Sequence, residues 1–98
     1  MTKFGELIKG DAPILFGFYE KSKTESESLE TIFDEVLQKF KKRVRIYKIE
    51  ASENQKLLAA LKVDYFPTVI IFKEGEMLWR KNKTVNVDEI IEVLTPVL

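Results

Sequence analysis

The stretch FPTVIIFKEGE, residues 66–76, decides how the rest of the chain is interpreted. Its apolar run at residues 69–72 lies between a proline and the pair Glu74-Gly75, which is typical of a buried strand that ends in a tight turn. Residues 77–80 are again mostly apolar. The stretch therefore predicts a β-hairpin whose two strands are antiparallel.

Upstream of the hairpin the sequence predicts two more strands with a helix between them. Residues 13–19 are continuously apolar, as expected for a strand buried on both faces, and residues 44–49 form the second strand. A helical crossover between two strands of one sheet makes them parallel. The apolar stripe of the intervening helix consists of Leu29, Ile32, Phe33, Val36, Leu37 and Phe40.

Three shorter helices complete the pattern. They are expected around residues 4–9, around the leucines at 57, 58 and 61, and around residues 87–94, where Pro96 should end the last helix near Thr95. A capping box pairs a serine, threonine or asparagine with a glutamate or glutamine three residues later. The expected pairs are Ser22 with Glu25, Ser52 with Gln55, and Asn86 with Glu89.

The resulting order is β-α-β-α-β-β-α, which predicts an α/β fold with a mixed four-stranded core sheet flanked by helices on both faces. We see no linker, repeat or low-complexity tract, so residues 1–98 are expected to form a single domain. The apolar periodicity does not define the order of the strands in the sheet.

Composition excludes several classes of function. The chain has no cysteine and no histidine, so it has no disulfide, no thiolate nucleophile, no Cys/His metal site and no imidazole base. Sixteen basic and sixteen acidic residues give zero formal charge, which disfavours nucleic acid and anionic membranes as partners. No cofactor is indicated. Without a signal-peptide-like or membrane-spanning stretch, a soluble cytoplasmic protein is expected.

Two blocks of the sequence resemble the thioredoxin family. Residues 66–76 resemble the family's proline-threonine strand and its "FKNGE" hairpin, and residues 32–36, IFDEV, resemble the "ILDEI" stretch of its long helix. The two blocks align without a gap between them, and the match extends over most of the chain. The resemblance implies a thioredoxin fold.

The same alignment places residues 22–26 where the family carries W-C-G-P-C. Lys23 stands at the nucleophilic cysteine, Ser26 at the resolving cysteine, and Gly17 at the family's buried acid. Disulfide exchange requires a thiolate, so the resemblance does not bring dithiol redox catalysis to this chain. An assignment to cell redox homeostasis would reflect fold resemblance only.

The resemblance also implies a peptide-binding surface. In the family the proline that matches Pro67 is cis, the residue before it offers its backbone to an extended peptide, and Lys83 matches a glycine on the third side of the groove. The candidate peptide-binding residues are Ser22, Lys23, Thr24, Ser26, Phe66, Pro67 and Lys83. The cations Lys21, Lys23 and Lys83 would favour an acidic extended segment of a peptide or protein partner.

Three alternatives remain at this point. Pro67 can serve only to shape the start of its strand, and the chain can be a stable scaffold without a specific site. The third alternative is an enzyme with unrelated chemistry that uses Lys23 as a nucleophile or base. That chemistry needs a neutral amine, which the polar helix start with its neighbouring glutamates disfavours.

Overall fold

In the computed structural model, residues 2–20, 25–83 and 85–98 are described, with the side chains of residues 2–4 and 25–28 excepted. The helices and strands are α1 (Thr2–Leu7), β1 (Ile14–Tyr19), α2 (Glu25–Phe40), β2 (Arg45–Glu50), α3 (Gln55–Leu61), β3 (Thr68–Lys73), β4 (Glu76–Asn82) and α4 (Val87–Leu94). Short 3-10 turns follow α2, β2 and α4 at Lys41–Arg43, Ala51–Glu53 and Thr95–Val97.

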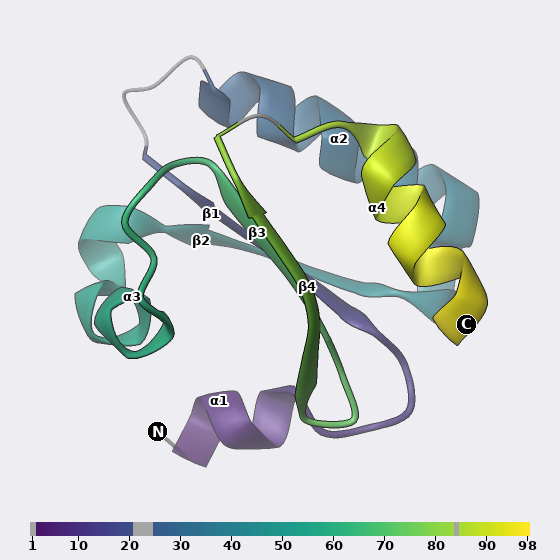
Figure 1. The fold of residues 1–98 in the computed structure, drawn as a ribbon, viewed down its shortest axis with the longest axis horizontal. Helices are drawn as coiled ribbons and strands as arrows, with labels where there is room; N and C mark the ends of the chain where they lie inside the picture. Colours follow the sequence, from purple (N-terminus) through teal and green to yellow (C-terminus); the bar gives the residue numbers. More distant parts are fainter. Residues whose placement is uncertain (1, 21–24, 84) are drawn as a thin grey trace.

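The four strands form one mixed sheet in the order β2-β1-β3-β4. β1 and β2 are parallel, as the helical crossover predicts, while β3 is antiparallel to both β1 and β4. Glu74 and Gly75 turn the chain between β3 and β4 with positive φ angles of 53° and 84°, as a two-residue hairpin turn requires. The predicted hairpin, crossover and mixed sheet are confirmed (Figure 1).

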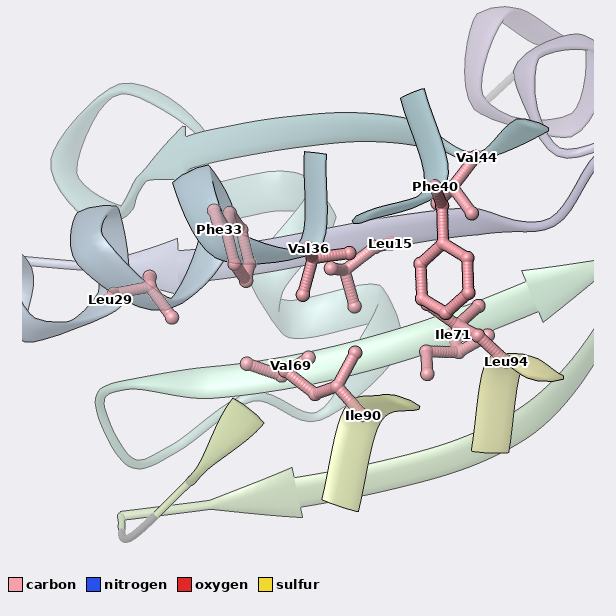
Figure 2. Close-up of a cluster of buried hydrophobic side chains, with 10 residues drawn as sticks. All are labelled: Leu15, Leu29, Phe33, Val36, Phe40, Val44, Val69, Ile71, Ile90 and Leu94. Atoms are coloured by element: carbon pink, nitrogen blue, oxygen red, sulfur yellow. The ribbon is translucent and has the colours of Figure 1, made fainter. Parts of the chain in front are cut away.

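Helices cover both faces of the sheet. α2 and α4 lie on one face, over a core that includes Leu15, Val69 and Ile71 from the strands (Figure 2). α1 and α3 belong to the other side, where Leu7 and Leu58 join a cluster built on Phe16, Ile70 and neighbouring strand residues. The expectation of helices on both faces is therefore confirmed.

The central position of β1 explains its unbroken apolar sequence. Residues Ile14, Leu15, Phe16 and Phe18 are all fully buried. Leu15 points into the core beneath α2 and α4, whereas its neighbours Ile14 and Phe16 belong to the opposite cluster. A strand with a core on each face has no position for a polar side chain.

Two of the three expected capping pairs fall within the described residues. Asn86 caps α4 as predicted, because its side-chain oxygen accepts a 3.0 Å hydrogen bond from the Glu89 amide. The Ser52 prediction is wrong: Asn54 is the N-cap of α3, and the Ser52 hydroxyl instead donates to the Glu50 carboxylate. Ser22 of the third pair lies outside the described residues.

Candidate functional site

The ends of all four strands meet at one edge of the sheet. Tyr19 at the end of β1 pairs with Glu50 at the end of β2, and Thr68 at the start of β3 pairs with both Phe18 and Asn82. Along this edge the strand ends therefore follow the order β2, β1, β3, β4. The segments that enter and leave these strands are brought together there, which places Phe66, Pro67 and Lys83 side by side in space.

The segment before β3 crosses this edge outside the sheet. The Phe66-Pro67 peptide bond is cis, Pro67 is buried and Phe66 is half-buried. The Lys83 amide donates to the Pro67 carbonyl over 2.8 Å, and the Thr68 hydroxyl donates to the Tyr65 carbonyl. Because both ladders of β3 begin at Thr68, the Phe66 backbone lies beyond the paired part of the strand.

Lys83 and Tyr65 form the exposed part of this segment. The Lys83 ammonium nitrogen lies 4.3 Å from the centroid of the Tyr65 ring, well within the range of a cation–π contact. The Tyr65 side chain is 52% exposed, and Lys83 has a left-handed backbone with φ of 69°. An aromatic ring and a cation thus stand together on the surface beside Phe66 and Pro67.

A cavity of about 580 Å³ lies next to Phe66, which is one of its lining residues. It lies between the ends of β1 and β2, the first part of α3 and the loop that joins α3 to β3. Its lining residues are Glu20, Glu50, Ala51, Ser52, Gln55, Leu58, Val63, Asp64 and Phe66. Three acidic residues and three large apolar residues therefore line one space.

Glu50 is held in place at the floor of this cavity. Glu50 is only 8% exposed. Its carboxylate accepts hydrogen bonds from the Ser52 hydroxyl and, over 3.1 Å, from the Ser52 amide. The Asn54 side chain donates to the Glu50 carbonyl over 2.9 Å. These bonds fix the turn from β2 into α3 and keep a carboxylate at the cavity wall.

The position that the resemblance assigns to a buried acid is filled differently here. A Cβ atom built on Gly17 would overlap the Phe33 ring and would approach Leu29 Cδ2 to 3.0 Å. Both neighbours are buried residues of α2. The space next to Gly17 is therefore occupied by an aromatic side chain rather than by an ionisable group.

The structure brings together three of the seven candidate residues: Phe66, Pro67 and Lys83. Ser26 lies in the first turn of α2, and its side chain is outside the described part. The remaining candidates, Ser22, Lys23 and Thr24, lie outside the described residues, as does Lys21. The peptide-binding role of the seven residues thus stays a prediction.

Sequence reasoning missed Tyr65 and the acidic cavity. The sequence indicates core or partly covered surface for Tyr65, and the carboxylates at 20, 50 and 64 are too far apart in sequence to form a motif. The signal that could have found them is positional: Glu50 ends β2, Glu20 directly follows β1, and Asp64 and Tyr65 lie just before β3. Recognising that these residues lie close together requires the order of the strands in the sheet.

Two searches of the described residues bear on metal and membrane binding. Within ranges 2–20, 25–83 and 85–98, no group of three or more acidic side chains is placed so that it could hold a metal ion. None of the helices in those ranges is long and apolar enough to cross a membrane.

Comparisons with known proteins agree on the family. The thioredoxin family model matches residues 1–96. Thioredoxin M3 of rice chloroplasts is 27% identical over 70 residues, 71% of this chain and 40% of the rice protein. Thioredoxin of Rickettsia bellii is 28% identical over 71 residues, 72% of this chain and 68% of that protein.

Solved structures show the same fold. A mutant thioredoxin of Halobacterium salinarum superimposes with a TM-score of 0.85 at 21% identity, covering 99% of this chain and 84% of that one. The predicted fold class is thus confirmed by the family match, the sheet topology and this neighbour together. The chain belongs to the thioredoxin family, and its 98 residues contain no cysteine.

Proposed function

We propose that this chain is a non-redox member of the thioredoxin family that binds an extended segment of a protein or peptide partner. The binding surface is the Phe66 surface, which we define as Tyr65, Phe66, Pro67 and Lys83. The absence of cysteine supports the non-redox part of the proposal, because thiol–disulfide exchange has no chemical alternative to a thiolate.

The observation that carries the binding proposal is the exposed ring of Tyr65 with the Lys83 ammonium 4.3 Å from its centroid. Tyrosine is one of the residues most enriched where protein partners bind, since it offers a large rigid contact area. Lys83 adds a positive charge to the same patch.

The backbone next to this patch supports an extended partner. The hydrogen-bond ladders of β3 start at Thr68, so Phe66, two residues earlier, is not part of the sheet. An extended segment that lies along Phe66 can gain affinity from main-chain hydrogen bonds and selectivity from its side chains. The anchoring bonds at Pro67 and Thr68 keep this segment fixed before a partner arrives.

The proposal can be tested by NMR chemical-shift mapping with pairs of extended octapeptides. One peptide of each pair carries a glutamate and the other a glutamine at the same position. The backbone amides of residues 65, 66, 68 and 83 are expected to shift, and the glutamate peptide is expected to bind more tightly because Lys83 attracts it. The gain should shrink as salt rises, since exposed charges are screened within roughly 10 Å at 0.1 M salt.

A pair of charge-reversal variants separates Lys83 from general electrostatics. Lys83→Glu should weaken binding of the glutamate peptide about three- to tenfold, because a weak attraction becomes a weak repulsion. Lys41→Glu is the matched control, since Lys41 is another exposed lysine with a left-handed backbone, at the far end of α2. If both variants weaken binding equally, Lys83 is not part of the binding surface. If no peptide shifts residues 65–68 and 83, the proposed function is wrong and the scaffold alternative gains.

A further inference from the structure

We propose that Glu89 fixes the position of Lys83, so that Lys83 recognises an acidic residue at one position of the bound segment. This inference rests on the proposed function and specifies its partner. The partner is then an extended segment whose acidic residue has a fixed offset from the residue that lies over Phe66. Glu89 belongs to α4 and is a positioning residue, because it acts on the Phe66 surface through the backbone and not by contact with the partner.

The Glu89 carboxylate ties the end of β4 to the start of α4. The Lys81 ammonium, from β4, donates to both oxygens of this carboxylate over 2.6 Å. The Asn86 side-chain nitrogen donates to one of the same oxygens over 2.7 Å, and the Asn86 side-chain oxygen accepts from the Glu89 amide over 3.0 Å. Residues 81–86 are therefore a short stretch whose two ends are bonded to one side chain.

The geometry of these contacts differs from that of a simple surface ion pair. The side chains of Lys81 and Glu89 are 38% and 30% exposed, so neither is fully solvated. The pair of Lys48 with Glu30, by contrast, uses one carboxylate oxygen and leaves the Glu30 side chain 62% exposed. A surface ion pair contributes to stability mainly where several groups form a network of good geometry, and this condition holds at Glu89.

Lys83 lies in the middle of this stretch and has a backbone conformation that needs support. Its φ of 69° is in the left-handed region, which is strained for a residue with a Cβ atom. Its amide donates to the Pro67 carbonyl over 2.8 Å. Beyond Lys83 the chain continues to Asn86, which is bonded to Glu89. The Glu89 contacts at both ends of the stretch thus limit the conformations that are open to Lys83.

A fixed backbone places the Lys83 charge at one point of the Phe66 surface. The ammonium nitrogen lies 4.3 Å from the centroid of the Tyr65 ring, and Tyr65 directly precedes Phe66. Successive residues of an extended segment are roughly 3.3 Å apart and point to opposite faces. A cation that is held in place therefore faces an acid at one position better than at the positions beside it. A lysine on an unrestrained turn makes this distinction poorly, because its stem is flexible.

The test is a glutamate scan of an octapeptide that shifts the amides of residues 65, 66, 68 and 83. Each peptide of the scan carries glutamate at one position and is compared with its glutamine counterpart by NMR titration. The scan is repeated with Lys83→Met, which removes the charge and keeps an unbranched side chain. Any gain from Lys21 or Lys23, which lie outside the described residues, is common to both proteins and cancels. The Lys83-dependent gain should peak at one position, at about threefold.

Glu89→Asp tests the positioning role without a change of charge. Aspartate is one methylene shorter, so its carboxylate cannot keep the contacts with both Lys81 and Asn86. The Lys83-dependent gain at the preferred position should fall about twofold and become more even across the scan, and the Lys83 amide should exchange its hydrogen faster than in the wild type. Glu92→Asp is the matched control, because Glu92 is an exposed glutamate of the same helix. It should change neither quantity.

The outcomes separate this inference from the proposed function. If the Lys83-dependent gain is the same at every position in the wild type, Lys83 does not recognise one position and the inference is wrong. If Glu89→Asp keeps the wild-type pattern of gains, even with a lower free energy of unfolding, Glu89 has a structural role only and the inference is again wrong. In both cases the shifts at residues 65–68 and 83 leave the peptide-binding function standing. If no peptide shifts those residues, both fail.

Discussion

Gly17 and Phe33 act as a pair. Gly17 is buried in the central strand β1, and the Phe33 ring of α2 occupies the space that any side chain at position 17 would need. Buried cores are packed nearly as densely as organic crystals, so such a space is not available to two groups at once. The pair explains how β1 and α2 approach closely at the position where the family resemblance implies an acid.

The first residue-scale prediction follows from that overlap. Gly17→Ala should lower the free energy of unfolding by about 1–3 kcal/mol, the usual cost of adding atoms to a packed core. In a Phe33→Leu background the same substitution should cost less, because the ring that it would overlap is gone. Urea unfolding of the two single variants and the double variant measures this coupling.

Gly5→Ala serves as the control for the glycine series. Gly5 lies in α1, and a Cβ atom there would have no neighbour within 4 Å. Alanine is the better helix former by roughly 1 kcal/mol, so this variant should be neutral or slightly stabilised. A Gly17→Ala protein that is as stable as Gly5→Ala would show that the ring moves aside without cost.

Single residues also mark the limits of prediction from sequence. Asn86 is predictable as a cap because Glu89 follows at the right spacing, and the Asn86 side chain bonds both the Glu89 amide and the Glu89 carboxylate. Ser52 has the same spacing to Gln55, but the buried Glu50 carboxylate two residues earlier accepts its hydroxyl. Whether Glu50 can accept from Ser52 depends on where β2 ends, and the spacing from Ser52 to Gln55 gives no information about that.

At the scale of elements, α3 depends on a contact from a distant strand. The Arg80 guanidinium, from β4, donates to the carbonyls of Leu61 and Lys62 at the C-terminal end of α3. The last carbonyls of a helix have no partner within the helix. Arg80 therefore supports the loop of residues 63–66, which forms one wall of the acidic cavity.

Arg80→Lys should loosen this wall. A lysine ammonium is a compact charge and lacks the planar fork that reaches two carbonyls at once, so we expect a loss of about 1 kcal/mol in unfolding free energy. Amide hydrogen exchange at residues 58–66 should become faster than in the wild type. Arg43→Lys in the exposed turn after α2 is the matched control, and equal exchange in both variants would contradict the role given to Arg80.

The elements, the parallel and antiparallel pairings and the helices on both faces were predictable, but the order of the strands in the sheet was not. The apolar run at residues 69–72 and the pair Glu74-Gly75 define a hairpin through local chemistry alone. The position of β1 between β2 and β3 results from pairing between strands that are distant in sequence. Hydrophobic periodicities of two or 3.6 residues describe local structure and do not predict such pairing. The acidic cavity depends on that pairing, and this is why the sequence did not predict it.

At the scale of the whole molecule, a thioredoxin fold is present without the sulfur chemistry that defines dithiol exchange. The purified chain should show no reduction of insulin above buffer in the presence of a dithiol, because it has no redox-active sulfur. The rate of insulin precipitation measures this, with a cysteine-containing thioredoxin as the positive control. Turnover above buffer by a homogeneous sample would contradict the non-redox proposal.

The Phe33 ring over Gly17 also constrains how this sequence can evolve. An acid at position 17 is costly as a single substitution, because the new side chain and the ring would overlap. Prior replacement of Phe33 by a smaller residue lowers that cost, at the expense of a cavity beneath α2. The pair therefore favours one order of the two substitutions over the other.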